Sequence, residues 1–242
     1  MLVLATAICA KGIPQRSSPL ADSTQLIVVT TANWSAIDGS LRRYQRTTSK
    51  TSWEPVGDPI AVAVGKTGLG WGIGMATIPA HPPEDPVKQE GDRKAPAGIF
   101  HIGTAFGDAP APSSGWKMPY QPLTSSIECV DDPQSKFYNH VVDRASVKPD
   151  WNSSEHMRDV GDAYRWGAVV GQNPRNQPRA GSCVFLHIWA GAGIGTEGCT
   201  AMAEPHIEAL LAWLNPVAHP VLVQLPLPQY RQAEKALHLP SL

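Results

Sequence analysis

Cysteine and charge are both scarce in this chain of 242 residues. Four cysteines are too few for a small scaffold in which disulfides replace a hydrophobic core. Charged residues make up 17% of the chain and apolar residues 42%, which excludes a coiled coil and a disordered chain. Lys and Arg number 20 against 21 Asp and Glu, so no basic field covers the molecule and nucleic acid is not expected as a partner.

The N-terminal run MLVLATAICA is apolar and uncharged, but it is too short to cross a bilayer, so no stable membrane insertion is expected. The run is typical of the apolar core of an export signal, with Ala10 before a cleavage site. The basic leader that normally comes first is missing, which suggests that the true start lies upstream. A buried first strand is the alternative. We expect a periplasmic or secreted protein, and we set residues 1–20 aside as a leader.

Glycine and proline are abundant, at 21 and 23 residues, and indicate short strands joined by many turns. Nothing resembling a linker divides the chain, so a single domain over 21–242 is expected. We expect loops at 79–93 and 107–115 and a hairpin turn at Asp38-Gly39. β-branched and alternating segments predict strands at 25–30, 39–46, 60–64, 71–75, 98–102, 166–170, 182–188 and 220–225.

The clearest helix is expected over Glu204–Leu214, where an apolar stripe recurs at helical spacing and Asn215-Pro216 follows. A weaker helix is expected over Ser154–Val160, and the tail after Pro226 is expected to pack loosely. The predicted fold class is therefore mainly β with a few short helices.

One segment, GSCVFLHIWAGAGIGTEGCTAMA over 181–203, combines a β-rich run ending near His187, a glycine-rich loop and Cys199. Small residues around a cysteine allow backbone N–H groups to approach a substrate, and a histidine one loop away is a suitable base for a thiol. A cysteine shortly before a helix can also feel the positive end of that helix, which favours thiolate. This pattern makes Cys199 a candidate nucleophile and His187 its candidate base.

Three stretches resemble the YkuD-type L,D-transpeptidase catalytic domain of bacterial cell-wall enzymes. KAPAGIFHIG (94–103) is similar to the family's strand entry, FLHIW (185–189) to the strand with its histidine, and GTEGCTAM (195–202) to its nucleophile motif. The stretch CVDDPQSKFYNHVVD resembles a divergent branch of the same family. The resemblance covers roughly residues 90–226 and implies a YkuD-like β-sandwich.

The resemblance also implies roles for individual residues. Cys199 would be the nucleophile and His187 the base, with the Ile188 carbonyl orienting the imidazole. Gly198 and Cys199 would supply oxyanion-stabilising N–H groups, and Thr196 matches the Ser/Thr of the motif. The implied reaction is acyl transfer on peptidoglycan stem peptides through a thioester, without metal or other cofactor.

Further residues near these motifs are candidate substrate contacts, namely Glu197, Trp189, Tyr138 and Asn139. Two departures from the commoner family pattern leave the substrate open: Glu197 stands where a histidine is frequent, and Ala201 where arginine or asparagine is frequent. An L,D-carboxypeptidase that transfers the acyl group to water is one alternative, and a non-catalytic wall-binding module is another.

Other interpretations of the cysteines and histidines remain open. Cys199 and His187 alone would suit a buried core. Cys183, His187, Cys199 and His206 offer zinc ligands, but their spacing fits no compact zinc motif. Cys129 and Cys183 are candidates for a disulfide if the protein is exported, and two unrelated buried thiols are the alternative.

Overall fold

The computed structural model describes residues 18–48, 50–75, 82–110 and 115–242. The expected export signal lies almost entirely outside the described residues. Within the expected leader, however, Leu20 is described and is buried in the main core. Parts of the two expected loops, 79–93 and 107–115, also fall outside the described residues.

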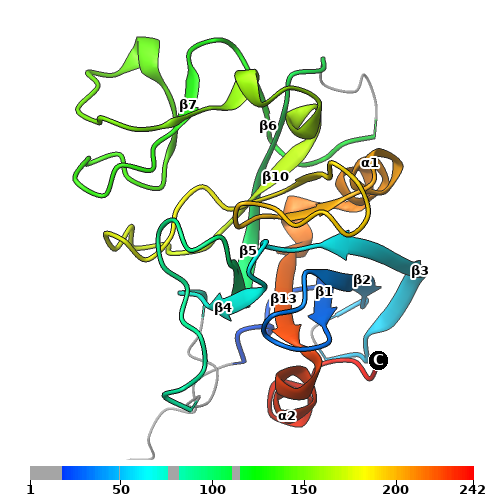
Figure 1. The fold of residues 1–242 in the computed structure, drawn as a ribbon. Helices are drawn as coiled ribbons and strands as arrows, with labels where there is room; N and C mark the ends of the chain where they lie inside the picture. The colour runs from blue at the N-terminus through cyan, green and yellow to red at the C-terminus, as the bar shows by residue number, and fades with distance from the viewer. Residues whose placement is uncertain (1–17, 49, 76–81, 111–114) are drawn as a thin grey trace, which may run out of the picture.

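Ten strands form one mixed sheet, and the pairing of β10 with β5 closes most of that sheet into a barrel (Figure 1). The order around the ring is β5-β10-β11-β12-β3-β2-β1-β13, and β4 (Leu69–Trp71) and β6 (Tyr120–Pro122) pair with β5 outside it. The ring strands are β1 Gln25–Thr31, β2 Asp38–Gln45, β3 Glu54–Ala63, β5 Ala95–Gly107, β10 Gly167–Val170, β11 Phe185–Ile188, β12 Thr200–Met202 and β13 Val221–Pro226. The two layers expected of a sandwich are thus joined at both sides.

The strand patterns of the sequence explain this arrangement. β1 is apolar from Leu26 to Val29 and lies between β2 and β13, whereas β2 buries only Leu41 and Tyr44 and leaves its other residues half-buried or exposed. The expected turn at Asp38-Gly39 is wrong, because these residues begin β2 and pair with Ala63 and Val62 of β3. The chain turns earlier, where the Asn33 carboxamide oxygen accepts the N–H groups of Ser35 and Ala36.

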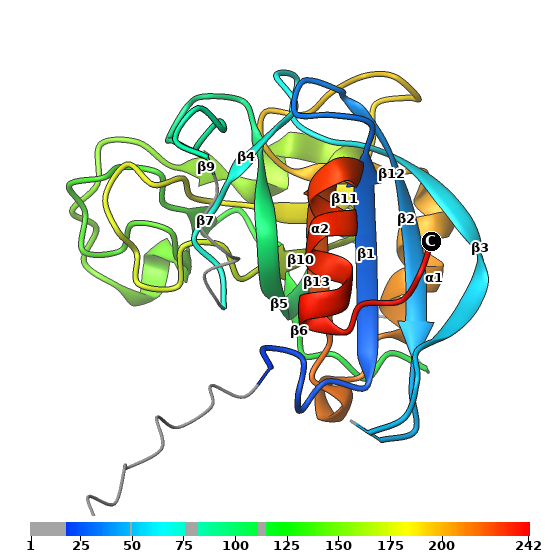
Figure 2. The same ribbon diagram turned by 90° about the horizontal axis from the view of Figure 1, so that it is seen from below.

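Two α-helices pack on the barrel. α1 (Glu204–Trp213) follows the expected range and contacts β10 and β11 through its buried face. α2 (Leu227–Leu237) occupies the tail that was expected to pack loosely, and it lies against β1 and β13 (Figure 2). Its Tyr230 is fully buried, and the hydroxyl donates to the Pro240 carbonyl oxygen at 2.6 Å. The tail is therefore a packed helix, and a proline in its first turn is compatible with this conformation.

Between β5 and β10 the chain leaves the barrel and forms a second, three-stranded sheet, called the small sheet below (Figure 1). Its strands are β7 Ile127–Cys129, β8 Val141–Asp143 and β9 Glu155–His156. The helix expected over 154–160 is instead β9 followed by the 3-10 segment η2 (Met157–Tyr164). The fully buried Glu128 on β7 ties the small sheet together by accepting hydrogen bonds from Trp151 and Ser154. The remaining short elements are η1 Arg144–Ser146 and η3 Pro216–Ala218.

None of the helices in the described ranges is long and apolar enough to cross a membrane.

Candidate active site

Cys199 and His187 are brought together by two neighbouring parallel strands. β11 carries His187, and β12 begins one residue after Cys199, with Leu186 paired to Thr200 and His187 to Ala201. Alternate residues along a strand point to the same side, so this register turns Cys199 and His187 to one side of the pair. Both side chains line one cleft of about 600 Å³. The structure therefore places the thiol and the imidazole of the sequence motif on the same cleft.

The Cys199 sulfur lies in a buried position with several polar partners. The backbone N–H of Phe185 donates to Sγ at 3.3 Å, and the thiol faces the Cys183 carbonyl oxygen at 3.6 Å. Tyr164 lines the same cleft, and its hydroxyl acts on the sulfur so as to lower the pKa of the thiol. An amide and a hydroxyl directed at sulfur both favour its ionised form over the thiol.

His187 is held by its backbone neighbour. Its Nδ1 lies 2.7 Å from the Ile188 carbonyl oxygen, and its ring meets Tyr164 edge-on with centroids 5.3 Å apart. A carbonyl oxygen can only accept, so Nδ1 carries the proton and Nε2 is left as the basic nitrogen. Ile188 therefore makes the contact that the resemblance implied for it.

Burial keeps both groups neutral in the unliganded site. It raises the pKa of the Cys199 thiol to about 12, an effect to which the Glu155 charge adds and which the Phe185 N–H and Lys88 oppose. It also lowers the pKa of His187 to about 4, against the smaller opposite effect of the Ile188 hydrogen bond. The positive N-terminal end of a helix does not stabilise the thiolate either, because α1 begins only at Glu204, beyond β12. The resting pair is thus a thiol beside a neutral imidazole.

The nucleophile loop is shaped by Thr196. Its hydroxyl donates to the Cys199 carbonyl oxygen at 2.7 Å and accepts the Gly198 N–H at 3.2 Å. The Gly198 N–H expected at an oxyanion is therefore engaged with Thr196 in this structure. Gly198 itself has φ +145°, and a Cβ there would lie 3.2 Å from the Lys94 carbonyl oxygen, so glycine is required for this path.

Glu197 and Trp189 also line the cleft, as their position in the motif suggested. Glu197 lies on the rim with 64% of its side chain exposed, where it pairs with Lys66 and with the Arg93 Nε at 3.2 Å. These two cations lower the pKa of the Glu197 carboxyl. Glu197 is therefore an ionised group at the entrance, bound to the loops before β4 and β5.

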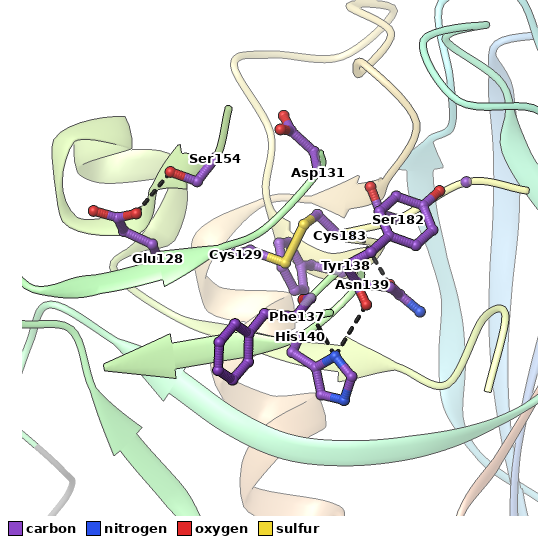
Figure 3. The surroundings of a disulfide bond; sticks show 12 residues. Glu128, Cys129, Asp131, Phe137, Tyr138, Asn139, His140, Ser154, Ser182 and Cys183 are labelled. Carbon is purple, nitrogen blue, oxygen red and sulfur yellow. Dashed lines mark hydrogen bonds between the residues drawn. A yellow bond between two sulfur atoms is a disulfide. The ribbon is translucent and has the colours of Figure 1, made fainter. Parts of the chain in front are cut away.

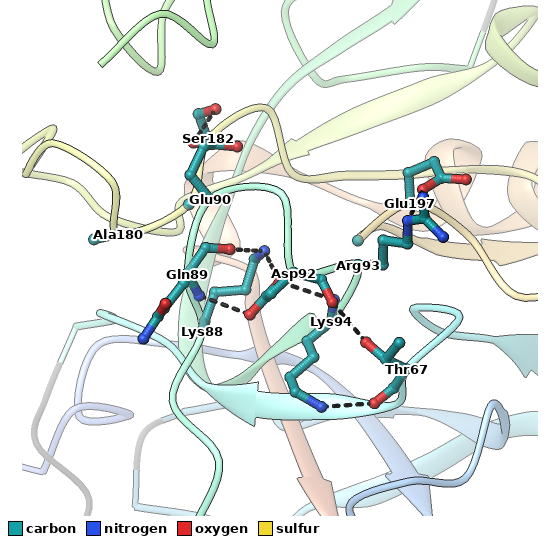
Figure 4. Close-up of polar contacts among 12 residues, drawn as sticks. Thr67, Lys88, Gln89, Glu90, Asp92, Arg93, Lys94, Ala180, Ser182 and Glu197 are labelled. Atoms are coloured by element: carbon teal, nitrogen blue, oxygen red, sulfur yellow. Dashed lines mark hydrogen bonds and ion pairs between the residues drawn. The ribbon is translucent and has the colours of Figure 1, made fainter. Parts of the chain in front are cut away.

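A buried lysine forms part of the cleft next to the nucleophile loop. The Lys88 ammonium donates to the Asp92 carboxylate and to the Gln89 carbonyl oxygen, as Figure 4 shows. Its side chain is 4% exposed, and a Cβ on Gly198 would lie 3.8 Å from its Nζ. This cation lies close enough to the sulfur to favour thiolate, although burial outweighs its effect.

Tyr138 and Asn139 do not line this cleft, contrary to expectation. Tyr138 is buried, and its hydroxyl donates to the Glu90 carboxylate. Asn139 uses its carboxamide within the fold, donating to the Gln172 carbonyl oxygen and accepting the Cys183 N–H at 3.1 Å. Both are framework residues, because they fix the segment that leads into β11.

Cys129 and Cys183 form a disulfide with their Cα atoms 5.9 Å apart (Figure 3). The bridge joins β7 of the small sheet to the segment that precedes β11, so it fastens one wall of the cleft to the strand that carries His187. Cys183 is therefore not available to a metal, and the part of the chain that the structure describes contains no cluster of three or more metal-ligating side chains.

Two further site residues escaped sequence reasoning, Tyr164 and Glu155. Both line the cleft, and both come from the segment between β5 and β10. Their hydroxyl and carboxyl groups interact, and each affects the pKa of the other. No local motif marks them, because only the folding of the small sheet against the barrel brings them to Cys199.

A cysteine, a histidine with its proton fixed on Nδ1 and a glycine-shaped loop, gathered on one cleft beside β11 and β12, are groups of the kind from which a thiol-dependent acyl-transfer site is built. The family model of the L,D-transpeptidase catalytic domain, YkuD, matches residues 36–223. The chain therefore belongs to the YkuD family of L,D-transpeptidase catalytic domains, a family that acts on peptidoglycan. No curated protein and no solved structure matches the chain.

Proposed function

We propose that this protein is a cysteine-dependent acyltransferase that remodels peptidoglycan stem peptides. The observation that carries the proposal is the placement of Cys199 and His187 on one cleft by adjacent parallel strands. Membership of the family supplies the substrate class, and the cleft of about 600 Å³ is large enough for a short peptide.

In the first half of the reaction the Cys199 sulfur attacks the carbonyl carbon of an L,D-peptide bond in the donor stem. His187 Nε2 takes the thiol proton as the C–S bond forms, so the ion pair exists only during attack. The tetrahedral oxygen accepts a hydrogen bond from the Cys199 backbone N–H. The C–N bond then breaks, the terminal D-residue leaves with the proton held by His187, and a thioester remains.

In the second half an acceptor nucleophile attacks the thioester. If it is an amine of a second stem peptide, His187 takes its proton, the thiol is regenerated and a crosslink forms. If water attacks, the product is a shortened stem peptide and the protein is an L,D-carboxypeptidase. Ala201 offers no polar group beside the nucleophile to select one acceptor, so both outcomes belong to the same chemistry.

Mass analysis of purified muropeptides incubated with the protein tests the proposal. We expect loss of a terminal D-residue from the donor, together with either a crosslinked dimer or a shortened monomer, and no change with Cys199→Ala. Unaltered muropeptides with the wild-type protein, or full activity of Cys199→Ala, would reject it.

We also propose that the protein works outside the cytoplasm. The apolar N-terminal run and the Cys129–Cys183 disulfide support this location, because disulfides persist in oxidising compartments. Fractionation of cells that produce the full chain, with thiol counting on the recovered protein, tests it. Recovery in the reduced form from the cytoplasm alone would contradict the proposal.

A further inference from the structure

The sulfur of Cys199 has a side-chain partner that the mechanism above does not use. Tyr164 lines the same cleft as Cys199 and Glu155, and its hydroxyl interacts electrostatically with both groups. Tyr164 is 4% exposed and lies in one apolar cluster with Phe106, Phe185 and Cys199. This packing places the end of η2 beside the nucleophile.

Packing fixes the position of the Tyr164 ring. It meets Phe106, Phe185 and His187 edge-on, with centroid distances of 5.3, 5.6 and 5.3 Å. A ring held from three sides directs its hydroxyl to one place, in the cleft that Cys199 and Glu155 also line. Removing the hydroxyl alone leaves all three ring contacts unchanged.

A tyrosine hydroxyl carries a single proton, and here two acceptors line the same cleft. While Cys199 is a thiol, the Tyr164 O–H can donate to the Glu155 carboxylate and its oxygen is available to the S–H group. Once the thiol proton has passed to His187 Nε2, the sulfur is an anion and becomes the stronger hydrogen-bond acceptor for the Tyr164 O–H. The tyrosine keeps its proton and only redirects its hydrogen bond.

We propose that Tyr164 is a third catalytic residue of this site, which stabilises the Cys199 thiolate by donating its hydroxyl hydrogen bond to Sγ, and that Glu155 is a positioning residue that holds the hydroxyl in place at rest. The proposal rests on the function proposed above insofar as Cys199 is the nucleophile. It predicts opposite effects for the two residues. Tyr164 helps the thiolate, whereas the negative charge of Glu155 opposes it.

The titratable and charged groups around the sulfur come from three parts of the fold. Glu155 and Tyr164 belong to β9 and η2, His187 to β11, and Lys88 to the loop before β5. Asp131, from the same wall as Glu155, adds its charge to the effects of burial on the Glu155 carboxyl and raises the pKa of that group. Among these groups Tyr164 is the one with a hydroxyl that can donate a hydrogen bond to sulfur, so its removal gives a specific signal.

The test is the rate of iodoacetamide alkylation of Cys199 across pH, measured by intact mass on the full chain. Tyr164→Phe is expected to move the alkylation profile upward by about 1–2 pH units and to slow labelling about 10–100-fold at fixed pH, because a hydrogen bond to a charged group is lost. Glu155→Gln keeps a hydrogen-bonding side chain but removes the charge, and is expected to move the profile downward. Tyr230→Phe, which removes a buried hydroxyl on α2 far from the cleft, is the matched control and is expected to follow wild type.

An unshifted profile for Tyr164→Phe, or a Glu155→Gln profile not displaced in the opposite direction, overturns the proposal. If Tyr164→Phe fails to fold, a fluorinated tyrosine incorporated at position 164 takes its place: its more acidic hydroxyl is a stronger hydrogen-bond donor and is expected to move the profile downward, and an unmoved profile overturns the proposal. Alkylation does not depend on a peptide substrate, so the two proposals fail separately. Shifted profiles with unaltered muropeptides reject the transferase, whereas active protein with superimposable profiles rejects only the role of Tyr164.

Discussion

The Nδ1 atom of His187 lies 2.7 Å from the carbonyl oxygen of Ile188, the next residue on β11. This contact fixes the tautomer by backbone geometry, without the carboxylate that often orients a catalytic histidine. A carbonyl dipole stabilises an imidazolium less than a full negative charge does. In keeping with this, burial outweighs the contact and lowers the pKa of His187 to about 4.

The pH dependence of activity follows from this shift. A base must be unprotonated to accept the thiol proton, so activity is lost as pH falls through the pKa of His187. We expect the acidic limb of kcat/KM on muropeptides near pH 4, well below the ordinary histidine value of about 6.5. An acidic limb near pH 6.5 would show that the imidazole is more solvated during turnover than the structure indicates.

Replacement of Cys199 separates chemistry from stability. Cys199→Ala is expected to abolish turnover and acyl-adduct formation, because no other described cysteine is a free thiol. Cys199→Ser is expected to be nearly as inactive, since an alcohol is a far weaker nucleophile at neutral pH. Intact mass with a donor peptide detects the adduct, and circular dichroism checks the fold. An adduct on Cys199→Ala would place the nucleophile elsewhere.

Local sequence signals predicted most of the barrel because each strand is defined by its own pattern. β1 is apolar from Leu26 to Val29, β2 buries Leu41 and Tyr44, and α1 has a helical stripe ended by Asn215-Pro216. One failure concerns only the position of a turn. Asp38-Gly39 has the composition of a turn, but the Asn33 side chain forms the turn earlier and β3 draws Asp38 into pairing.

The site was predictable only where it is contiguous in sequence. His187, Ile188 and the segment from Thr196 to Cys199 belong to one strand–loop–strand unit. Their spacing in the sequence is therefore enough to predict that they lie close together. Tyr164 and Glu155 reach the sulfur through the tertiary packing of the small sheet, which leaves no periodic signal. Tyr138 and Asn139 were misassigned because polar residues near a motif resemble cleft residues until their partners inside the fold are seen.

The Cys129–Cys183 disulfide is expected to stabilise the fold and the cleft together. It closes a loop of 54 residues, for which chain entropy predicts about 4 kcal/mol of unfolding free energy. Cys129→Ala/Cys183→Ala is therefore expected to lower the urea midpoint strongly and to reduce turnover. Wild-type protein treated with a reductant provides the control for side-chain effects. Its turnover, which depends on Cys199, is measured after the reductant has been removed. Equal midpoints for oxidised and reduced protein would show that the bridge contributes nothing.

Gly198→Ala tests whether the shape of the nucleophile loop matters apart from its chemistry. The residue has φ +145°, a region that side chains rarely adopt, and its Cβ would lie 3.2 Å from the Lys94 carbonyl oxygen. We expect a loss of about 1–3 kcal/mol in unfolding free energy from backbone strain. We also expect a large fall in turnover, because Cys199 follows directly and the Thr196 hydrogen bonds hold both residues.

Gly115→Ala is the matched control, since Gly115 also has positive φ, at +102°, but its Cβ would meet nothing within 4 Å among the described residues. Urea unfolding and muropeptide turnover of the two variants give the comparison. If Gly198→Ala keeps wild-type turnover, the path of the backbone before Cys199 is not what positions the sulfur.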